Sequence, residues 1–128
     1  MLFVCSWRWS QEKYVAVKVN ALSQPSRRVS AENELEIMTY VSLVNPQHKG
    51  WHFVRKLSDS FTLESASGTH TCLVLEALRE PLWLYSKRYV GGVIPPEILK
   101  ILVQMMLHAL DYLHSECRVI HTGWFEIS

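Results

Sequence analysis

Hydrophobic and polar residues alternate in the segment KYVAVKVN at 13–20. Its three odd-numbered valines share one face, and the other face carries Ala16, Lys18 and Asn20. Alternation with a period of two is typical of a β-strand whose two faces meet different environments. We therefore predict a strand here.

The polar segment NALSQPSRR at 20–28 is typical of a loop, and the periodicity then becomes helical. Ser30 is a candidate N-cap, with Glu32 in the first turn, where the positive end of the helix dipole favours a carboxylate. The periodic segment stops before an Asn-Pro pair. The sequence thus predicts a helix from Ser30 to about Val44.

Two further β-like runs, at 53–64 and 69–78, flank the turn-prone stretch SASGT and predict an antiparallel hairpin. Beyond them, REPLWLYSKRYV at 79–90 is typical of a short helix that ends at two glycines. Pro95 and Pro96 then open a long helix to about Ser115. We expect an α+β fold with one boundary, between a domain at 1–78 and a domain at 79–128.

Glu34 carries the first chemical signal. It shares a helical stripe with Ile37, Met38 and Val41. A carboxylate in line with a core-facing stripe is costly to bury without a cation, and Lys18 is the candidate. An ammonium held in this way can be aimed at phosphate oxygens. The alternative is that both residues lie on unrelated surfaces.

Composition and charge narrow the choice of partners. The 128 residues are 48% hydrophobic and 20% charged, which is typical of an ordinary folded domain. Thirteen basic and twelve acidic residues give a net charge of +1, so no strong field favours nucleic acid or an anionic membrane. We expect neither a nucleic-acid nor a membrane partner.

Cysteine and histidine give no sign of a metal site. The three cysteines form no C-x-x-C pair, and their odd number suits a reducing compartment. The six histidines are scattered rather than set at ligand spacing. The apolar start is too short for a secretory signal, and polar residues interrupt the apolar stretch at 98–113. We expect no metal ligands, no signal peptide and no membrane-spanning helix.

Several motifs resemble those of protein kinases. VAVK at 15–18 follows the kinase strand signature V-A-I-K, and the helix with Glu34 comes next. TCLVLEAL at 71–78 is similar to the kinase strand that leads into the hinge between lobes. The segment at 98–122 resembles the long helix before the catalytic loop. The closest resemblance is to the SR-protein kinases, and it is carried by GTHTCLVLEAL and LDYLHSECRVIHT. These serine/threonine kinases phosphorylate arginine-serine-rich splicing factors, and their catalytic motif has Thr before Asp.

The resemblance runs from about Trp7 to Thr122 and implies a protein-kinase-like fold. An incomplete small lobe, an antiparallel sheet plus one helix, would precede the first helices of the large lobe. The family would use ATP and Mg²⁺, act on arginine-serine-rich proteins, and reside in the cytoplasm or nucleus. The site residues that it implies have these roles: Ala16 against the adenine, Lys18 on phosphates, Glu34 anchoring Lys18, Leu75 as gatekeeper, and the Glu76 carbonyl and Leu78 N–H on the adenine edge. An ordinary core strand is the alternative for the hinge.

The kinase pattern breaks at both ends of the chain. No G-x-G-x-x-G occurs, and Gly123 stands where His121 and Thr122 should be followed by the catalytic aspartate. Glycine has no carboxylate to orient a hydroxyl or accept its proton. The Asn and Asp-Phe-Gly that hold magnesium are also absent. An intron read through after the first base of an aspartate codon would produce this change, and so would a truncated paralogue. We therefore expect no catalytic or metal residues here and no kinase activity of the chain alone.

The long helix after Pro96 is apolar around most of its girth. Without the rest of a large lobe it would expose a large apolar patch, and we expect poor stability and capture by a chaperone or a kinase partner. The alternative function is accordingly a non-catalytic, pseudokinase-like interaction module.

Overall fold

The computed structural model describes residues 2–6, 14–20 and 25–119. Two compact units divide the chain. The first is drawn from 1–43 and 55–77, and the second from 44–54 and 78–128. The segment 44–54 thus groups with the second unit, although it precedes the hairpin of the first.

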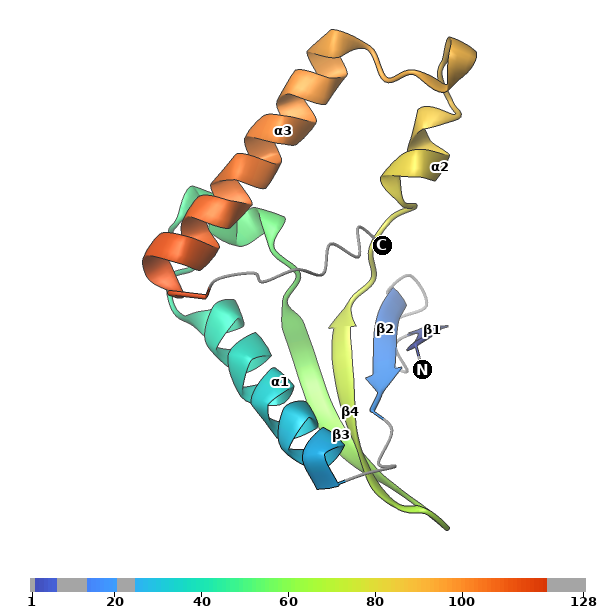
Figure 1. The fold of residues 1–128 in the computed structure, drawn as a ribbon, viewed down its shortest axis with the longest axis vertical. Coiled ribbons are helices and arrows are strands. Elements are labelled where there is room, and N and C mark those ends of the chain that lie inside the picture. Colours follow the sequence, from blue (N-terminus) through green and yellow to red (C-terminus); the bar gives the residue numbers. More distant parts are fainter. Residues whose placement is uncertain (1, 7–13, 21–24, 120–128) are drawn as a thin grey trace. The chain divides into compact units, whose positions relative to one another are not determined.

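A four-stranded antiparallel sheet forms the first unit, in the order β1-β2-β4-β3 (Figure 1). Its strands are β1 (Leu2–Ser6), β2 (Tyr14–Val19), β3 (Leu57–Ser65) and β4 (Gly68–Glu76). β2 confirms the strand expected from alternation. β3 and β4 confirm the hairpin, although β3 begins four residues later than expected because 49–53 form a 3-10 helix.

The core of the first unit lies where β2 and β4 pair. Ala16, Leu73 and Leu75 form its buried cluster, and Leu73 is fully inaccessible to solvent. Helix α1 (Pro25–Leu43) packs Leu35 and Met38 against this cluster. The face of β2 that carries Ala16 therefore faces α1.

The expected start of α1 was wrong. The helix begins at Pro25, so Ser30 lies within it and is not its N-cap. Proline fits the first helical turn because its φ is already helical and the N–H that it lacks would have no partner inside the helix. The end of the helix was predicted to within one residue, because α1 stops at Leu43.

The second unit is helical. It contains the 3-10 helix η1 (Lys49–Phe53), α2 (Leu82–Ser86), the 3-10 turn η2 (Val90–Gly92), α3 (Pro96–Asp111) and a final π-helical turn, η3 (Tyr112–Glu116). The short helix and the long helix opened by Pro96 are confirmed. The short helix ends at Ser86 rather than at the two glycines, which lie in η2. η1 packs on α3, where the rings of Phe53 and His108 stack at 6.3 Å between centroids.

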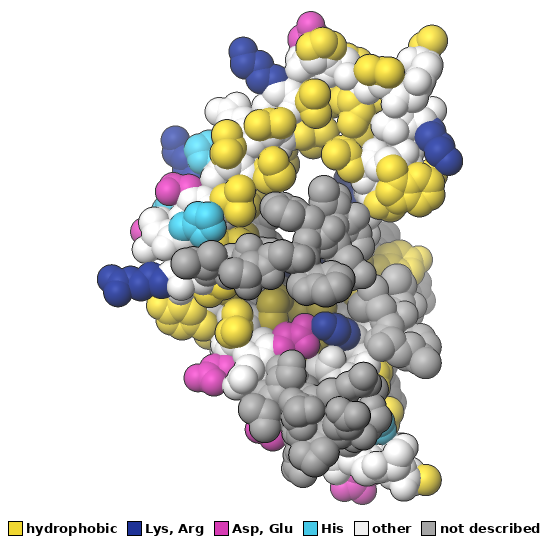
Figure 2. Space-filling model, viewed as in Figure 1, with side chains coloured by type: hydrophobic (Ala, Val, Ile, Leu, Met, Phe, Trp, Pro, Cys, Tyr) yellow, Lys and Arg dark blue, Asp and Glu magenta, His cyan; other side chains and the backbone are white. Residues whose placement is uncertain are grey.

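Helix α3 exposes much of its apolar surface. No residue within it is buried, and six of its large apolar side chains, including Ile101 and Leu107, are 37–57% exposed. Figure 2 shows hydrophobic side chains gathered over this helix. In the described part of the chain, no helix is both long and apolar enough to cross a membrane.

Candidate functional site

Lys18 and Glu34 form an ion pair in the first unit. Lys18 Nζ lies 2.5 Å from Glu34 Oε1, which joins β2 to α1. The side chains are 40% and 34% exposed, so the pair is neither buried nor on unrelated surfaces. An ion pair this accessible contributes roughly 1 kcal/mol or less to stability. Its lasting effect is geometric, because it restricts where the ammonium can lie.

Ala16 and Leu75 lie directly opposite each other in the register of β2 and β4. Both are buried in the same core cluster, two residues along β2 from Lys18. Residues two apart on a strand share a face, so the small apolar surface and the ammonium lie on one side of the sheet. The ammonium is partly exposed on this face, and the two apolar side chains are buried beside it.

Glu76 ends β4 and is tied to the start of the hairpin. Its carboxylate accepts a hydrogen bond from the backbone N–H of Lys56 at 3.2 Å, and its backbone carbonyl accepts one from Arg55 Nε at 2.9 Å. Burial lowers the pKa of Arg55, and the negative charge of Glu76 opposes that effect. A carbonyl oxygen has two lone pairs, so the Glu76 carbonyl retains capacity for one further donor.

The remaining residues expected at the site lie elsewhere. Leu78 lies two residues after β4, where the chain enters the second segment of the second unit, and it is exposed. His121, Thr122 and Gly123, which resemble the approach to a catalytic loop, lie outside the described residues. No group of three or more His, Cys, Asp or Glu side chains among the described residues could hold a metal ion.

Sequence reasoning missed two residues of this neighbourhood. Asn20 Nδ2 lies 3.5 Å from Glu34 Oε2, and Arg55 holds the Glu76 carbonyl. The alternation of β2 places Asn20 on the face of Lys18, which was the available signal. No sequence pattern pointed to Arg55, because its contact joins the residue before the hairpin to Glu76 at the hairpin's far end.

A second polar cluster lies in the second unit, around the buried Tyr112. Its phenol bonds with the Cys117 thiol and with the backbone of Asn45, and Asn45 Nδ2 also donates to Glu116 at 3.1 Å. Burial is the main cause that raises the pKa of Tyr112 to about 12, and burial likewise raises the pKa of the Cys117 thiol. Both groups are therefore protonated at neutral pH, which makes this cluster structural rather than nucleophilic.

This cluster predicts a loss of stability in alkali. The folded chain keeps the Tyr112 proton up to about pH 12, whereas an unfolded tyrosine loses it near its ordinary pKa of 10. The raised pKa of Tyr112 therefore adds to the free energy of unfolding on the order of 2 kcal/mol. This stabilisation is complete below about pH 10 and is lost as the pH rises toward 12. Chemical denaturation across this range should show the fall, with a shallower fall in Tyr112→Phe. Equal slopes for the two proteins would contradict it.

The arrangement in the first unit defines a class of protein. A lysine on a strand of an antiparallel sheet, held by a glutamate of the following helix, is the arrangement that protein kinases use to hold ATP phosphates. In this chain the pair joins β2 and α1 within an α+β fold. The class is thus protein-kinase-like.

Sequence comparison identifies the branch of that class. The chain is 36% identical over 112 residues to a serine/threonine protein kinase of Aspergillus fumigatus. This match covers 88% of the chain and 27% of that kinase. It is 32% identical over 118 residues to human SRSF protein kinase 3, covering 91% of the chain and 20% of the kinase. It is 33% identical over 111 residues to protein kinase dsk1 of Schizosaccharomyces pombe, covering 87% of the chain and 20% of the kinase. No protein-family model matches the chain.

The chain is therefore homologous over about nine-tenths of its length to serine/threonine kinases of the SR-protein kinase family, as its motifs indicated. It spans between a fifth and about a quarter of the length of these curated relatives.

Proposed function

We propose that this chain is a part of an SR-protein-kinase-like serine/threonine kinase that binds adenine nucleotide through its first unit and does not transfer phosphate by itself. The observation that carries the proposal is the Lys18–Glu34 ion pair on the face of β2. The whole protein would phosphorylate arginine-serine-rich proteins with ATP and Mg²⁺, in the cytoplasm or nucleus.

The residues present fit the phosphate end of a nucleotide. Lys18 has three N–H donors, of which the Glu34 carboxylate takes one, and its side chain is 40% exposed. A phosphate oxygen can therefore reach the ammonium while the ion pair stays in place. Lys18 would position the phosphates, and Glu34 would keep the ammonium from swinging away.

The adenine end would rest on the apolar part of the same face. Ala16 presents a side chain small enough for a flat ring to approach the strand, and Leu75 would bound the pocket as gatekeeper. The free lone pair of the Glu76 carbonyl would bind the adenine edge.

Phosphoryl transfer requires groups that are missing from these 128 residues. Gly123, not an aspartate, directly follows Thr122, so the group that would receive the proton of a serine hydroxyl is missing, and no Asp-Phe-Gly is present to hold Mg²⁺. Nucleotide bound to the chain alone would therefore stay intact.

ATP should raise the melting temperature of the wild-type chain but not that of Lys18→Ala. At ten times its dissociation constant, a ligand that binds only the folded state stabilises it by about 1.4 kcal/mol. Lys18→Ala removes the phosphate contact from a half-exposed position, so it should fold. Lys100→Ala, on the exposed surface of α3, is the matched control and should respond like wild type. Radiolabelled ATP with an arginine-serine peptide should show no transfer.

Equal ATP shifts in wild type and Lys18→Ala would contradict the proposed site. Phosphate transfer that Lys18→Ala abolishes would contradict the proposed inactivity.

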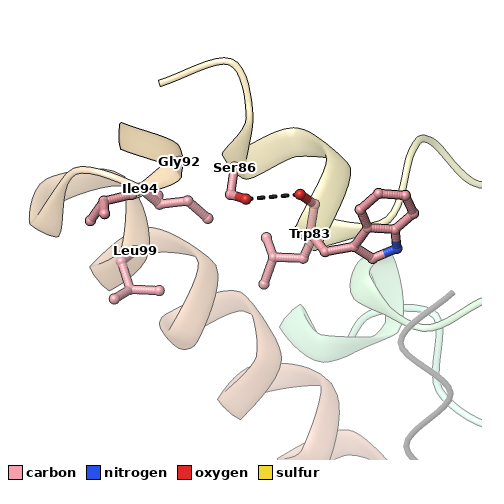
Figure 3. A pocket seen from close by; sticks show the side chains of 7 residues that line it. Trp83, Ser86, Gly92, Ile94 and Leu99 are labelled. Carbon is pink, nitrogen blue, oxygen red and sulfur yellow. Dashed lines mark hydrogen bonds between the residues drawn. The ribbon is translucent and has the colours of Figure 1, made fainter. Parts of the chain in front are cut away.

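A second candidate is the non-catalytic interaction module. Besides the exposed apolar surface of α3, the second unit has a pocket of about 570 Å³. This pocket is lined by Leu82, Trp83, Ser86, Gly92, Val93, Ile94 and Leu99. The Ser86 hydroxyl donates to the Trp83 carbonyl at 2.8 Å, and the Trp83 indole points away from Ile94 and Leu99 (Figure 3). A chaperone or a kinase could cover such a surface. This candidate predicts no ATP response in any variant.

A further inference from the structure

Asn20 is fixed to β4 through both of its backbone polar groups. Its N–H donates to the carbonyl of Thr71 at 3.1 Å, and its carbonyl lies 2.9 Å from Nδ1 of His70. Asn20 directly follows the last residue of β2, where a strand end would otherwise be free to fray. With both backbone groups held, the side chain leaves the sheet in a defined direction.

The hairpin in turn holds His70. A carbonyl can only accept, so Nδ1 of His70 carries the proton that it gives to Asn20, and in the neutral ring Nε2 is then the acceptor. Ser65 Oγ lies 2.7 Å from that Nε2 and can donate to it. The two ring nitrogens of His70 therefore link the Asn20 carbonyl to Ser65 of the hairpin.

Asn20 extends this link to Glu34. Its amide Nδ2 lies 3.5 Å from Glu34 Oε2, while Lys18 binds Oε1 of the same carboxylate. The amide contact is long, as expected for a half-exposed contact between two side chains. The two carboxylate oxygens of Glu34 thus have different partners, Lys18 on β2 and Asn20 just after it, and the carboxylate can turn less freely about its terminal torsion.

We propose that Asn20 is a positioning residue of the nucleotide site, which holds the Glu34 carboxylate in the orientation that aims Lys18. The inference rests on the proposed nucleotide function and adds a residue to it. Asn20 has no direct contact with the ligand in this proposal. Its effect passes through Glu34, and the two residues should therefore act as one unit.

The test compares Asn20→Ala with Asn33→Ala in the full chain. Asn33 is exposed on α1 beside Glu34, so its variant controls for loss of an amide near the site. Asn20→Ala keeps the backbone contacts and loses only the amide. It should weaken ATP binding about two- to fivefold, the effect of one long hydrogen bond at the weak end of the usual range, and Asn33→Ala should not.

A merely structural role is excluded by a double-mutant cycle. In a Glu34→Ala background, Asn20→Ala should produce no further loss of ATP affinity, because the carboxylate that it positions is gone. Losses that simply add would overturn the proposal, as would an Asn20→Ala variant that binds ATP like wild type.

Lys18 labelling separates this inference from the nucleotide function. N-hydroxysuccinimide acetate acylates lysine amines, and peptide mass spectrometry gives the rate at each lysine. If the wild-type chain fails to bind ATP, the nucleotide proposal falls, and the positioning of Lys18 is judged from these rates. Release of Lys18 in Asn20→Ala should speed its acylation about twofold relative to the exposed Lys100, by the same modest hydrogen-bond effect. An unchanged ratio would overturn the inference.

Discussion

Gly50→Ala should cost the second unit about 3 kcal/mol or more, because a methyl group has no room at this position. A Cβ on Gly50 would lie 1.9 Å from the carbonyl oxygen of His108 and 2.7 Å from the Cβ of Tyr112. The carbonyl belongs to the backbone of α3 and cannot rotate away. The 3-10 helix η1 and α3 would have to separate, and the stacking of Phe53 on His108 would be lost with them.

Gly91→Ala is the matched control for this effect. Nothing lies within 4 Å of a Cβ placed there, but Gly91 has φ +72°, which a side chain disfavours. The expected cost is roughly 1 kcal/mol, from the left-handed backbone alone. Denaturant unfolding followed by helical circular dichroism measures both variants. A Gly50→Ala chain no less stable than Gly91→Ala would show that η1 does not approach α3 this closely.

Leu73→Ala should destabilise the first unit by about 2–5 kcal/mol. Leu73 is fully buried in one cluster with Ala16 and Leu75, and Leu35 and Met38 of α1 pack against this cluster. Removing three carbons there loses their transfer free energy and leaves a cavity that a paired strand cannot close. Because Leu73 lies opposite Lys18 in the register, the variant should also lower the apparent affinity for ATP.

Leu63→Ala provides the comparison on the same hairpin. Leu63 is about half exposed on β3, so its truncation should cost less than about 1 kcal/mol. Urea unfolding of wild type and both variants gives the three free energies. Equal losses for Leu63→Ala and Leu73→Ala would mean that the core does not lie at the β2–β4 pairing.

Much of the fold could be predicted because its signals are local. The alternation around Lys18 gave β2, the turn-prone SASGT gave the hairpin, and the two prolines gave the start of α3. The Lys18–Glu34 pair could also be predicted, because the strand periodicity and the helix periodicity each place one of the two residues on a core-facing side. The family followed from motifs whose order along the chain is specific.

The features that sequence reasoning missed depend on contacts between distant residues. Gly50 looks like a turn glycine, and only the approach of α3, almost sixty residues later, gives the reason for it. Asn20 is bound by residues of β4 fifty positions away. The start of α1 was misplaced because a serine followed by acidic residues resembles a helix N-cap more closely than a proline in a polar segment resembles a helix start.

An ATP titration followed by the backbone amide resonances of the chain tests the nucleotide site most directly. The proposed site predicts shifts concentrated at Ala16 to Asn20 and at Leu75 and Glu76, with amides along α3 unmoved and with the shifts lost in Lys18→Ala. Shifts centred on α2 and α3, or no shifts at ATP concentrations well above the millimolar range of weak ligands, would contradict nucleotide binding by the first unit.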